Sequence, residues 1–183
     1  MWDYAEGGFE NHNPHMDPAG KPIRPVLLVE DNENDVLFFR RALSKIHSNL
    51  PLQVLSDGQA AWDYLSGAGS THRPTRPSLI ILDLKLPKKS GLELLESLKR
   101  HPELRTLPVV VVTSSREQSD IDAVYEKGAD FYLVKSPDFA LAVEQAEGIH
   151  AYWTALCEHP DDPGADPTLY RLRRLSELSS PSI

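Results

Sequence analysis

Five short apolar runs, separated by stretches of helical periodicity, constrain the fold of this chain more than any other feature. Three of the runs are continuous and two are shorter: 26–29, 79–82 and 109–112, then 52–55 and 131–134. Runs without polar alternation are typical of strands that are covered on both faces, as in a parallel sheet. Each run is therefore expected to form one strand of a single buried sheet.

The stretches between the runs carry apolar residues every three or four positions, which indicates helices with one apolar face. These residues are Val36, Phe39, Leu43 and Ile46; Leu92, Leu95 and Leu98; Ile121, Val124 and Tyr125; and Phe139, Val143, Ala146, His150 and Trp153. Gly128 is expected to end one helix. Ser136, Pro137 and Asp138 are expected to supply the N-cap, the first residue and an early acid of the last helix. Five strands alternating with five helices predict an α/β sandwich of three layers.

The prolines divide the chain into a central domain and two tails. Of the 15 prolines, four lie in residues 1–25 and four in residues 157–183, where Gly, Asn and Asp are also frequent. We expect a flexible leader over residues 1–24, one domain over residues 25–156, and a flexible tail over residues 157–183. Four leucines recur every third residue in the tail, and a short docking helix or a frayed segment would both explain them: Leu169, Leu172, Leu175 and Leu178.

Charge and composition exclude several classes of protein. With 27 acidic and 19 basic residues, the formal net charge is −8, whereas nucleic-acid-binding domains usually carry a basic patch. No apolar run approaches the roughly 18 residues of a membrane span, and residues 1–10 lack the features of a signal peptide. The single cysteine, Cys157, excludes an internal disulfide and fits a reducing compartment. We expect a cytoplasmic protein with no nucleic acid or membrane partner.

Four of the five apolar runs end in polar residues of a definite kind. Glu30 and Asp31 follow the first run, Asp83 the third, Thr113 the fourth and Lys135 the fifth. Open parallel sheets bind ligands outside the carboxyl ends of their strands, where the strand order reverses. With the flavodoxin-like order 2-1-3-4-5, the three carboxylates would meet in one crevice, with Thr113 and Lys135 on its far side.

This set of side chains predicts a phosphoryl-transfer site. Three close carboxylates repel one another, and a hard divalent cation such as Mg²⁺ relieves the repulsion. Lys135 can neutralise one phosphoryl oxygen, and the Thr113 hydroxyl can donate to another. Because an aspartate can form an aspartyl-phosphate, Asp83 is the expected nucleophile.

The same strand ends resemble the motifs of response regulator receiver domains, in the family's order and near its spacing. The matching segments are Val-Glu-Asp-Asn at 29–32, Leu-Asp-Leu-Lys-Leu-Pro at 82–87, Val-Thr-Ser-Ser at 112–115 and Tyr-Leu-Val-Lys at 132–135. The resemblance covers about residues 25–156 and implies a doubly wound, flavodoxin-like fold. It also implies a signalling phospho-acceptor whose only catalytic activity is its own phosphorylation and dephosphorylation.

The resemblance implies a role for each motif residue. It makes Asp83 the phospho-acceptor, with Glu30 and Asp31 as the acid pair that binds Mg²⁺ or Mn²⁺ together with Asp83. Lys85 would contribute its backbone carbonyl to the metal. Thr113 would be the switch hydroxyl, Tyr132 the switch aromatic residue, and Lys135 the cation that binds the phosphoryl group.

A narrower resemblance concerns the partners. Residues 86–91 and 148–153 are similar to the stand-alone regulators of bacterial phytochrome-type histidine kinases. This implies phosphorelay signalling from such a kinase, with output by protein–protein interaction. The family also implies a homodimer through the face of the fourth and fifth helices, to which Ile121, Val124 and Tyr125 would contribute. Burial of these three residues in the core is the alternative.

Other local patterns keep two interpretations open. Residues 30–32 and 113–115 could each serve only as helix caps. Leu37 and Phe38 could form a kinase-docking patch or pack more deeply. Ser136 follows Lys135 where the family usually has a cis proline, so the isomer of this peptide bond stays open. Lys85 is longer and more charged than the residues often found at its position, which should change the lifetime of the phosphorylated form.

Two other functions are compatible with parts of the pattern. A phosphorylation-independent adaptor could share the fold, although the complete set of Asp83, Thr113 and Lys135 speaks against it. A phosphatase of the haloacid-dehalogenase type also uses Asp, Thr or Ser, and Lys at strand ends. That family has a second Asp two residues after its nucleophile, where this chain has Lys85. Its acid pair also follows the nucleophile, whereas Glu30 and Asp31 precede Asp83.

Overall fold

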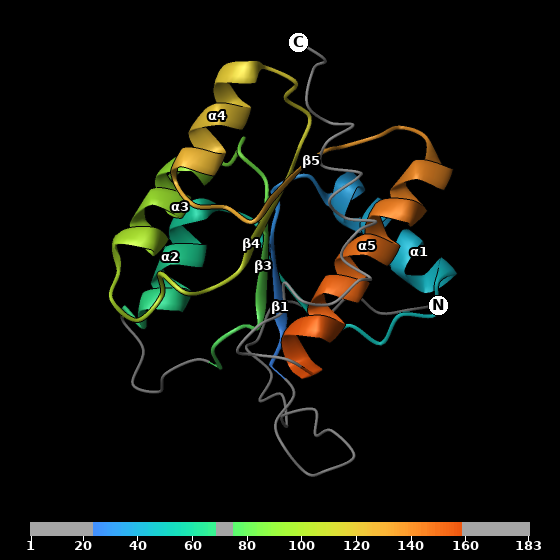
Figure 1. Cartoon of the computed structure of the whole chain (residues 1–183), viewed down its shortest axis with the longest axis horizontal. Coiled ribbons are helices and arrows are strands. Elements are labelled where there is room, and N and C mark those ends of the chain that lie inside the picture. The colour runs from blue at the N-terminus through green and yellow to red at the C-terminus, as the bar shows by residue number, and fades with distance from the viewer. Residues whose placement is uncertain (1–23, 69–74, 159–183) are drawn as a thin grey trace, which may run out of the picture.

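The computed structural model describes residues 24–68 and 75–158, which form a parallel sheet between two layers of helices (Figure 1). The strands are β1 (Val26–Val29), β2 (Leu52–Leu55), β3 (Leu79–Leu82), β4 (Val109–Thr113) and β5 (Phe131–Val134). The helices are α1 (Glu33–Lys45), α2 (Gly58–Ser66), α3 (Gly91–Arg100), α4 (Gln118–Glu126) and α5 (Phe139–Glu158). The strand order is β2-β1-β3-β4-β5, which confirms the predicted flavodoxin-like topology.

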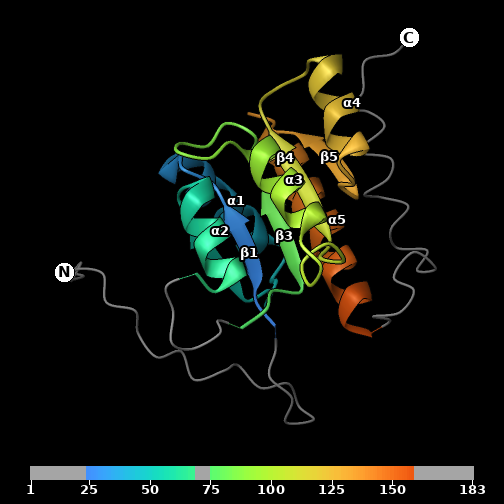
Figure 2. The same ribbon diagram turned by 90° about the vertical axis from the view of Figure 1, so that its left-hand side faces the viewer.

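Helices cover both faces of the sheet, as the continuous apolar runs predict, although the edge strand β2 is half-buried. Helices α1 and α5 cover one face, and α2, α3 and α4 cover the other (Figures 1 and 2). Successive strand residues point to opposite faces. Leu27 and Val29 therefore pack into the core beneath α2, α3 and α4, whereas Val26 and Leu28 pack beneath α1 and α5. A strand that is covered on both sides gains from apolar residues at every position, which explains the absence of polar alternation.

The register of the strands aligns their carboxyl ends. Val29 at the end of β1 pairs with Leu55 of β2 and with Leu82 of β3. Leu82 in turn pairs with Val111 of β4. Thr113 at the end of β4 pairs with Val134 of β5. The residues that directly follow β1, β3 and β5 are therefore brought to the same edge of the sheet as Thr113.

The structure confirms the predicted end of α4 but not the predicted cap of α5. Gly128 follows α4 with a left-handed φ of 87° and donates its amide to the Tyr125 carbonyl, as expected for a helix stop. The predicted cap of α5 is wrong in register. Asp138, not Ser136, caps the helix, because its carboxylate accepts the Ala140 amide at 2.8 Å and its carbonyl accepts the Ala142 amide at 3.0 Å. Pro137 lies before the helix, and the carboxylate of Asp138 gains from the helix dipole.

The last helix extends slightly beyond the expected end of the domain. Helix α5 continues to Glu158, past the expected domain end at residue 156. The expected leader lies outside the described residues except for Arg24, and the leucines of the tail lie outside them as well.

None of the described peptide bonds is cis, so the Lys135–Ser136 bond is trans. Among the described residues, the helices are too short or too polar to cross a membrane.

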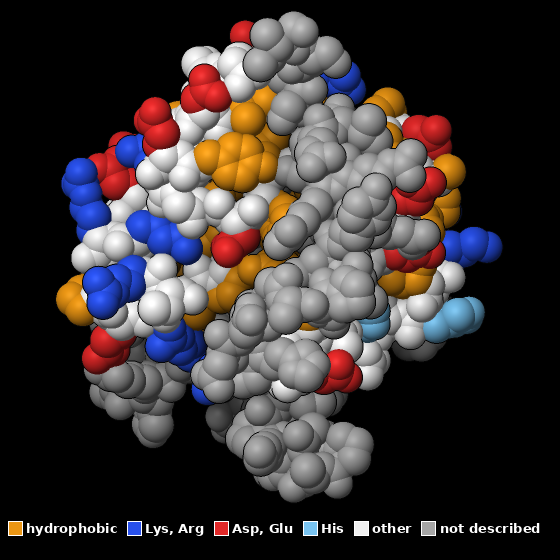
Figure 3. Space-filling view, viewed as in Figure 1, with side chains coloured by type: hydrophobic (Ala, Val, Ile, Leu, Met, Phe, Trp, Pro, Cys, Tyr) orange, Lys and Arg blue, Asp and Glu red, His pale blue; other side chains and the backbone are white. Residues whose placement is uncertain are grey.

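A few large apolar side chains remain on the surface. Leu37 is 57% exposed, Tyr125 is 41% exposed and Phe139 is 40% exposed. Phe38 is half-buried and meets the Phe139 ring edge to face, with ring centroids 5.5 Å apart. Ile121 and Val124 belong to the core, so the burial alternative holds for them and leaves Tyr125 on the surface of α4. On the face seen in Figure 3, basic and acidic side chains lie together at the edge formed by α3 and α4.

Candidate functional site

Three carboxylates meet at the carboxyl edge of the sheet. Glu30 and Asp31 follow β1, Asp83 follows β3, and one oxygen from each lies within 4.8 Å of the others. Glu30 and Asp83 are each 5% exposed, whereas Asp31 is exposed. The strand pairing of Val29 with Leu82 explains the convergence, because it sets the next residues of both strands side by side. The structure thus brings together the acids that the strand ends predicted.

Lys135 contacts this cluster from the end of β5. Its Nζ atom lies 2.7 Å from Oε2 of Glu30 and 2.8 Å from Oδ2 of Asp83. A third contact, 2.8 Å long, joins Nζ to Oδ2 of Asp35 in the first turn of α1. Sequence reasoning missed Asp35, because an acid in the first turn of a helix is explained by the helix dipole alone. Its position just after the Glu30–Asn32 segment was the available signal.

The charges of the cluster influence one another. Burial raises the pKa of Glu30 above its ordinary value, although the contact with Lys135 opposes the shift. Burial alone would lower the pKa of Lys135, but its hydrogen bonds to Asp35, Asp83 and Glu30 outweigh that effect and raise it. Lys135 therefore keeps its positive charge. It is the counter-ion that lets the carboxylates share one edge of the sheet.

Thr113 begins a loop that reaches α4. It is fully buried, and its hydroxyl oxygen accepts the Ser115 amide at 3.5 Å. The interpretation of residues 113–115 as a cap of α4 is wrong, since Glu117 occupies the N-cap position. The Ser115 hydroxyl instead donates to Oδ2 of Asp120 at 2.6 Å and accepts the Glu117 amide at 3.3 Å.

After β1, the interpretation of residues 30–32 as a helix cap holds in part. The Asn32 side chain accepts the Asn34 amide and caps α1.

Tyr132 connects β5 to the same loop. Its ring is 1% exposed, and its hydroxyl donates to the Ser115 carbonyl at 3.1 Å. Burial raises the pKa of this phenol, so the hydroxyl stays protonated as a donor. Tyr132 therefore links β5 directly to the loop between β4 and α4.

The loop between β3 and α3 closes against Asp83. The Lys85 amide donates to Oδ1 of Asp83 at 3.3 Å, and the Gly91 amide donates to the Leu84 carbonyl at 3.0 Å. A Cβ atom at Gly91 would lie 2.0 Å from the Asp83 carbonyl oxygen, so this position has no room for a side chain. Lys85, the predicted carbonyl donor, thus lies in a short loop that is fixed to the acid cluster at its start.

The donor set fits a hard divalent cation. Carboxylate and carbonyl oxygens are the preferred ligands of Mg²⁺, which is held by one or two carboxylates and keeps several waters. Glu30, Asp31 and Asp83 supply the carboxylates, and the exposed Asp31 opens the cluster to solvent. The mutual repulsion of these groups gives a second reason for a cation to bind.

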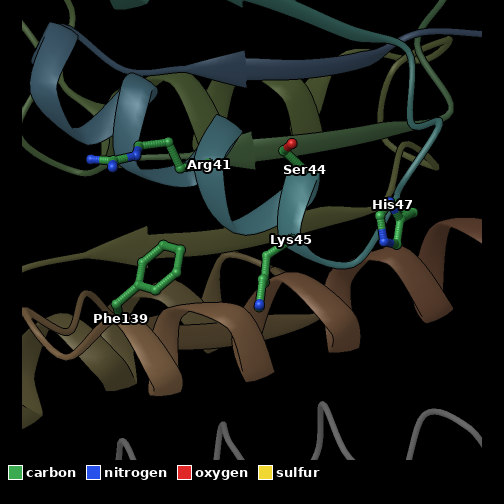
Figure 4. Close-up of a pocket in the computed structure, with 5 residues that line it drawn as sticks. All are labelled: Arg41, Ser44, Lys45, His47 and Phe139. Atoms are coloured by element: carbon green, nitrogen blue, oxygen red, sulfur yellow. The ribbon is translucent and has the colours of Figure 1, made fainter.

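Two hollows lie near α1. A cavity of about 80 Å³ adjoins the cluster, and both Glu30 and Lys135 line it together with apolar residues of α1 and α5. A larger hollow of about 400 Å³ is formed by Arg41, Ser44, Lys45 and His47 with Phe139 (Figure 4). None of the described residues that line the larger hollow is an acid, so it is distinct from the acid cluster.

The chain matches known proteins over most of the described residues. Residues 26–147 match the model of the response regulator receiver domain. The response regulator Rcp1 of Synechocystis is 37% identical over 138 residues, which span 75% of this chain and 94% of that protein.

Solved structures show the same similarity. The phosphorylated cyanobacterial phytochrome response regulator RcpA has a TM-score of 0.66 at 35% identity, covering 72% of this chain and 94% of its own. The Mn²⁺-bound form of Rcp1 has a TM-score of 0.65 at 38% identity, with 71% and 94% coverage. The bacteriophytochrome response regulator AtBRR has a TM-score of 0.57 at 43% identity, with 69% and 94% coverage.

Proposed function

Because the chain belongs to the response regulator receiver domain family, we propose that it transmits a signal by accepting a phosphoryl group from a histidine kinase onto Asp83. The observation that carries the proposal is the contact between Lys135 and Asp83, 2.8 Å long, within a cluster that includes Glu30 and Asp31. A buried carboxylate beside a fixed cation and two further acids is the arrangement that phosphoryl transfer to aspartate requires.

The transfer follows from the chemistry of these groups. An oxygen of Asp83 attacks the phosphorus atom of a phosphohistidine, the new P–O bond forms as the P–N bond breaks, and the released imidazole takes up a proton. Lys135 lies beside Asp83 and can hold one phosphoryl oxygen, while the Thr113 hydroxyl can donate to another. Mg²⁺ or Mn²⁺, held by Glu30, Asp31, Asp83 and the Lys85 carbonyl, would supply charge neutralisation at the phosphoryl oxygens.

Phosphorylation by a small phosphodonor tests the proposal. Incubation with an acyl phosphate and Mg²⁺ should add one phosphoryl group, which intact-protein mass spectrometry detects. The Asp83→Asn variant should not be modified. Asp122→Asn is the matched control, because it removes an exposed acid on α4 and should be modified like the wild type. Equal modification of Asp83→Asn and the wild type would contradict the proposal and favour an adaptor that does not depend on Asp83.

The partner that we propose is a phytochrome-type histidine kinase in the cytoplasm. The names of RcpA and AtBRR associate those relatives with phytochromes, and both are at least 35% identical to this chain. Rcp1 is matched over 94% of its length, which supports a regulator built around one receiver domain. Phosphotransfer profiling against the histidine kinases of the same organism tests the pairing, and preferential transfer from a kinase without a phytochrome module would refute it.

The output that we propose is a protein–protein interaction controlled by the loop between β4 and α4. The phosphoryl group would lie near Thr113. Ser115, which accepts the Tyr132 hydroxyl and donates its own hydroxyl to Asp120, would carry the change to α4. Tyr125 is exposed on this helix and is the residue that we assign to a homodimer contact through the α4 and α5 face. Sedimentation before and after phosphorylation tests the dimer, which Tyr125→Ser should weaken.

A further inference from the structure

The loop between β3 and α3 is held against the start of α2 by two consecutive lysines. Nζ of Lys88 lies 2.7 Å from Oδ2 of Asp57, and Nζ of Lys89 lies 4.9 Å from the centre of the Trp62 ring. A Cβ atom at Gly58 would lie 1.9 Å from the Lys89 carbonyl oxygen, so the loop backbone rests directly on the first turn of α2. None of these contacts involves the acid cluster.

Lys88 is held in a strained conformation. Its φ is 64°, in the left-handed region, and the Lys89 amide donates to the Pro87 carbonyl across it at 2.8 Å. Three-residue turns of this kind with positive φ are rare and strained for residues other than glycine. Such a conformation persists only where the surrounding contacts enforce it. The ion pair with Asp57 and the contact with Gly58 are those contacts.

Asp57 is a rigid anchor for this ion pair. It is 7% exposed, and its Oδ1 atom accepts the Ala60 amide at 2.7 Å as the N-cap of α2. The bonds from Lys88 and from the Ala60 amide lower the pKa of Asp57 below its ordinary value, so it stays ionised at neutral pH. Because one oxygen is committed to the helix, the other is held in place to accept the Lys88 ammonium group, although the Lys88 side chain is 66% exposed.

The opposite end of the loop is fixed as well. Gly91 contacts the Asp83 backbone so closely that no side chain fits there, and the Lys85 amide donates to the Asp83 carboxylate. Lys85 therefore lies between two fixed points, Asp83 on one side and Lys88 on the other.

We propose that Lys88 is a positioning residue for the cation site, because its ion pair with Asp57 holds the β3–α3 loop and with it the backbone at Lys85. The inference rests on the proposed function in one respect, since Lys85 is the carbonyl donor assigned there. No contact joins Lys88 to Glu30, Asp31 or Asp83 within the described residues. Its effect is to keep a ligand in place before the cation arrives.

Titration with Mg²⁺ distinguishes two ways in which Lys88 could affect the cation site, through its positive charge alone or through the position of the loop. If Lys88 acted only through its charge, Lys88→Ala would strengthen Mg²⁺ binding and Asp57→Asn would weaken it. If the ion pair positions the loop, both variants weaken Mg²⁺ binding by about threefold to tenfold. Asp57→Asn keeps the cap of α2, since asparagine is as good an N-cap as aspartate. The fold of this variant is therefore expected to survive.

Two further variants sharpen the test. Lys88→Gly also removes the ion pair but relieves the strain, because glycine adopts positive φ without cost, so it should weaken Mg²⁺ binding less than Lys88→Ala. Lys127→Ala is the matched control for charge. It removes a lysine whose Nζ lies 2.6 Å from Glu96, in an ion pair between α3 and α4. This variant should bind Mg²⁺ at least as tightly as the wild type.

Amide hydrogen exchange of the metal-free protein gives an independent readout. Exchange over residues 84–90 should be faster in Lys88→Ala and Asp57→Asn than in the wild type, whereas Lys127→Ala should leave it unchanged. Unchanged exchange together with unchanged or tighter Mg²⁺ binding in Lys88→Ala would overturn the inference. A wild type that binds Mg²⁺ but cannot be phosphorylated would instead overturn the proposed function alone.

Discussion

The Nζ atom of Lys135 lies 2.8 Å from Oδ2 of Asp83, although 52 residues separate the two along the chain. The same Nζ atom also contacts Glu30 and Asp35, so Lys135 joins carboxylates that follow β1 and β3 to one in the first turn of α1. This arrangement allows the charges of the site to be tested one at a time.

Removal of Lys135 should destabilise the metal-free protein. Lys135→Met leaves the largely buried carboxylates of Glu30 and Asp83 without their counter-ion, and we expect the free energy of unfolding to fall by about 2 kcal/mol. Mg²⁺ should restore part of the loss, because a ligand that binds only the folded state stabilises it. Urea unfolding with and without Mg²⁺ measures both effects. An unchanged stability of the metal-free variant would refute the counter-ion role.

Asp31 should matter for the cation and not for the fold. Its side chain is exposed, and no ion pair of Asp31 is found within the described residues. Asp31→Asn should weaken Mg²⁺ binding by about tenfold or more, while the free energy of unfolding without metal changes by less than about 0.5 kcal/mol. Calorimetric titration and urea unfolding give the two values. Glu33→Gln, which removes an exposed acid outside the cluster, should bind Mg²⁺ nearly as the wild type does.

Gly91 should be intolerant of a side chain. A Cβ atom there would meet the Asp83 carbonyl oxygen at 2.0 Å, so Gly91→Ala must displace either Asp83 or the start of α3. We expect a loss of about 1–3 kcal/mol in stability and slower phosphorylation. Gly67→Ala is the control, because Gly67 has a φ of 73° but no atom within 4 Å of the added Cβ. This control should lose about 1–2 kcal/mol without any change in phosphorylation.

His150 should make stability depend on pH. Burial lowers the pKa of its imidazole below the ordinary 6.5, and Nδ1 lies 2.8 Å from the Ser48 hydroxyl. The unfolded chain therefore takes up a proton at higher pH than the folded protein does. The contribution of His150 is fully present above about pH 6.5 and is lost as the pH falls through the folded pKa. Urea unfolding across this range should show a decline that is smaller in His150→Gln.

The fold was predictable because the apolar runs are continuous. Residues such as Leu27 and Ile81 are buried whichever face they point to, so the pattern in the sequence and the strand in the structure coincide. The acid cluster followed from the same information, since the ends of parallel strands lie at one edge of the sheet. The order β2-β1-β3-β4-β5 then placed Glu30 beside Asp83.

Contacts between distant segments were not predictable. Asp35 and the Asp57–Lys88 pair depend on which helices and loops become neighbours, and each of the two acids has a sufficient local explanation at a helix start. The prediction that Ser136 caps α5 was wrong for a related reason. Ser136 and Asp138 are both good capping residues, and only the path of the chain after β5 decides between them.

The contribution of β5 to the site has a consequence for protein synthesis. Glu30, Asp31 and Asp83 leave the ribosome well before Lys135, so a nascent chain that stops short of β5 holds the acids without their cation. Such a chain also lacks the strand that pairs with β4 and carries Tyr132. The phosphoryl transfer proposed above would therefore require that translation has passed the last strand, which brings both Lys135 and Tyr132.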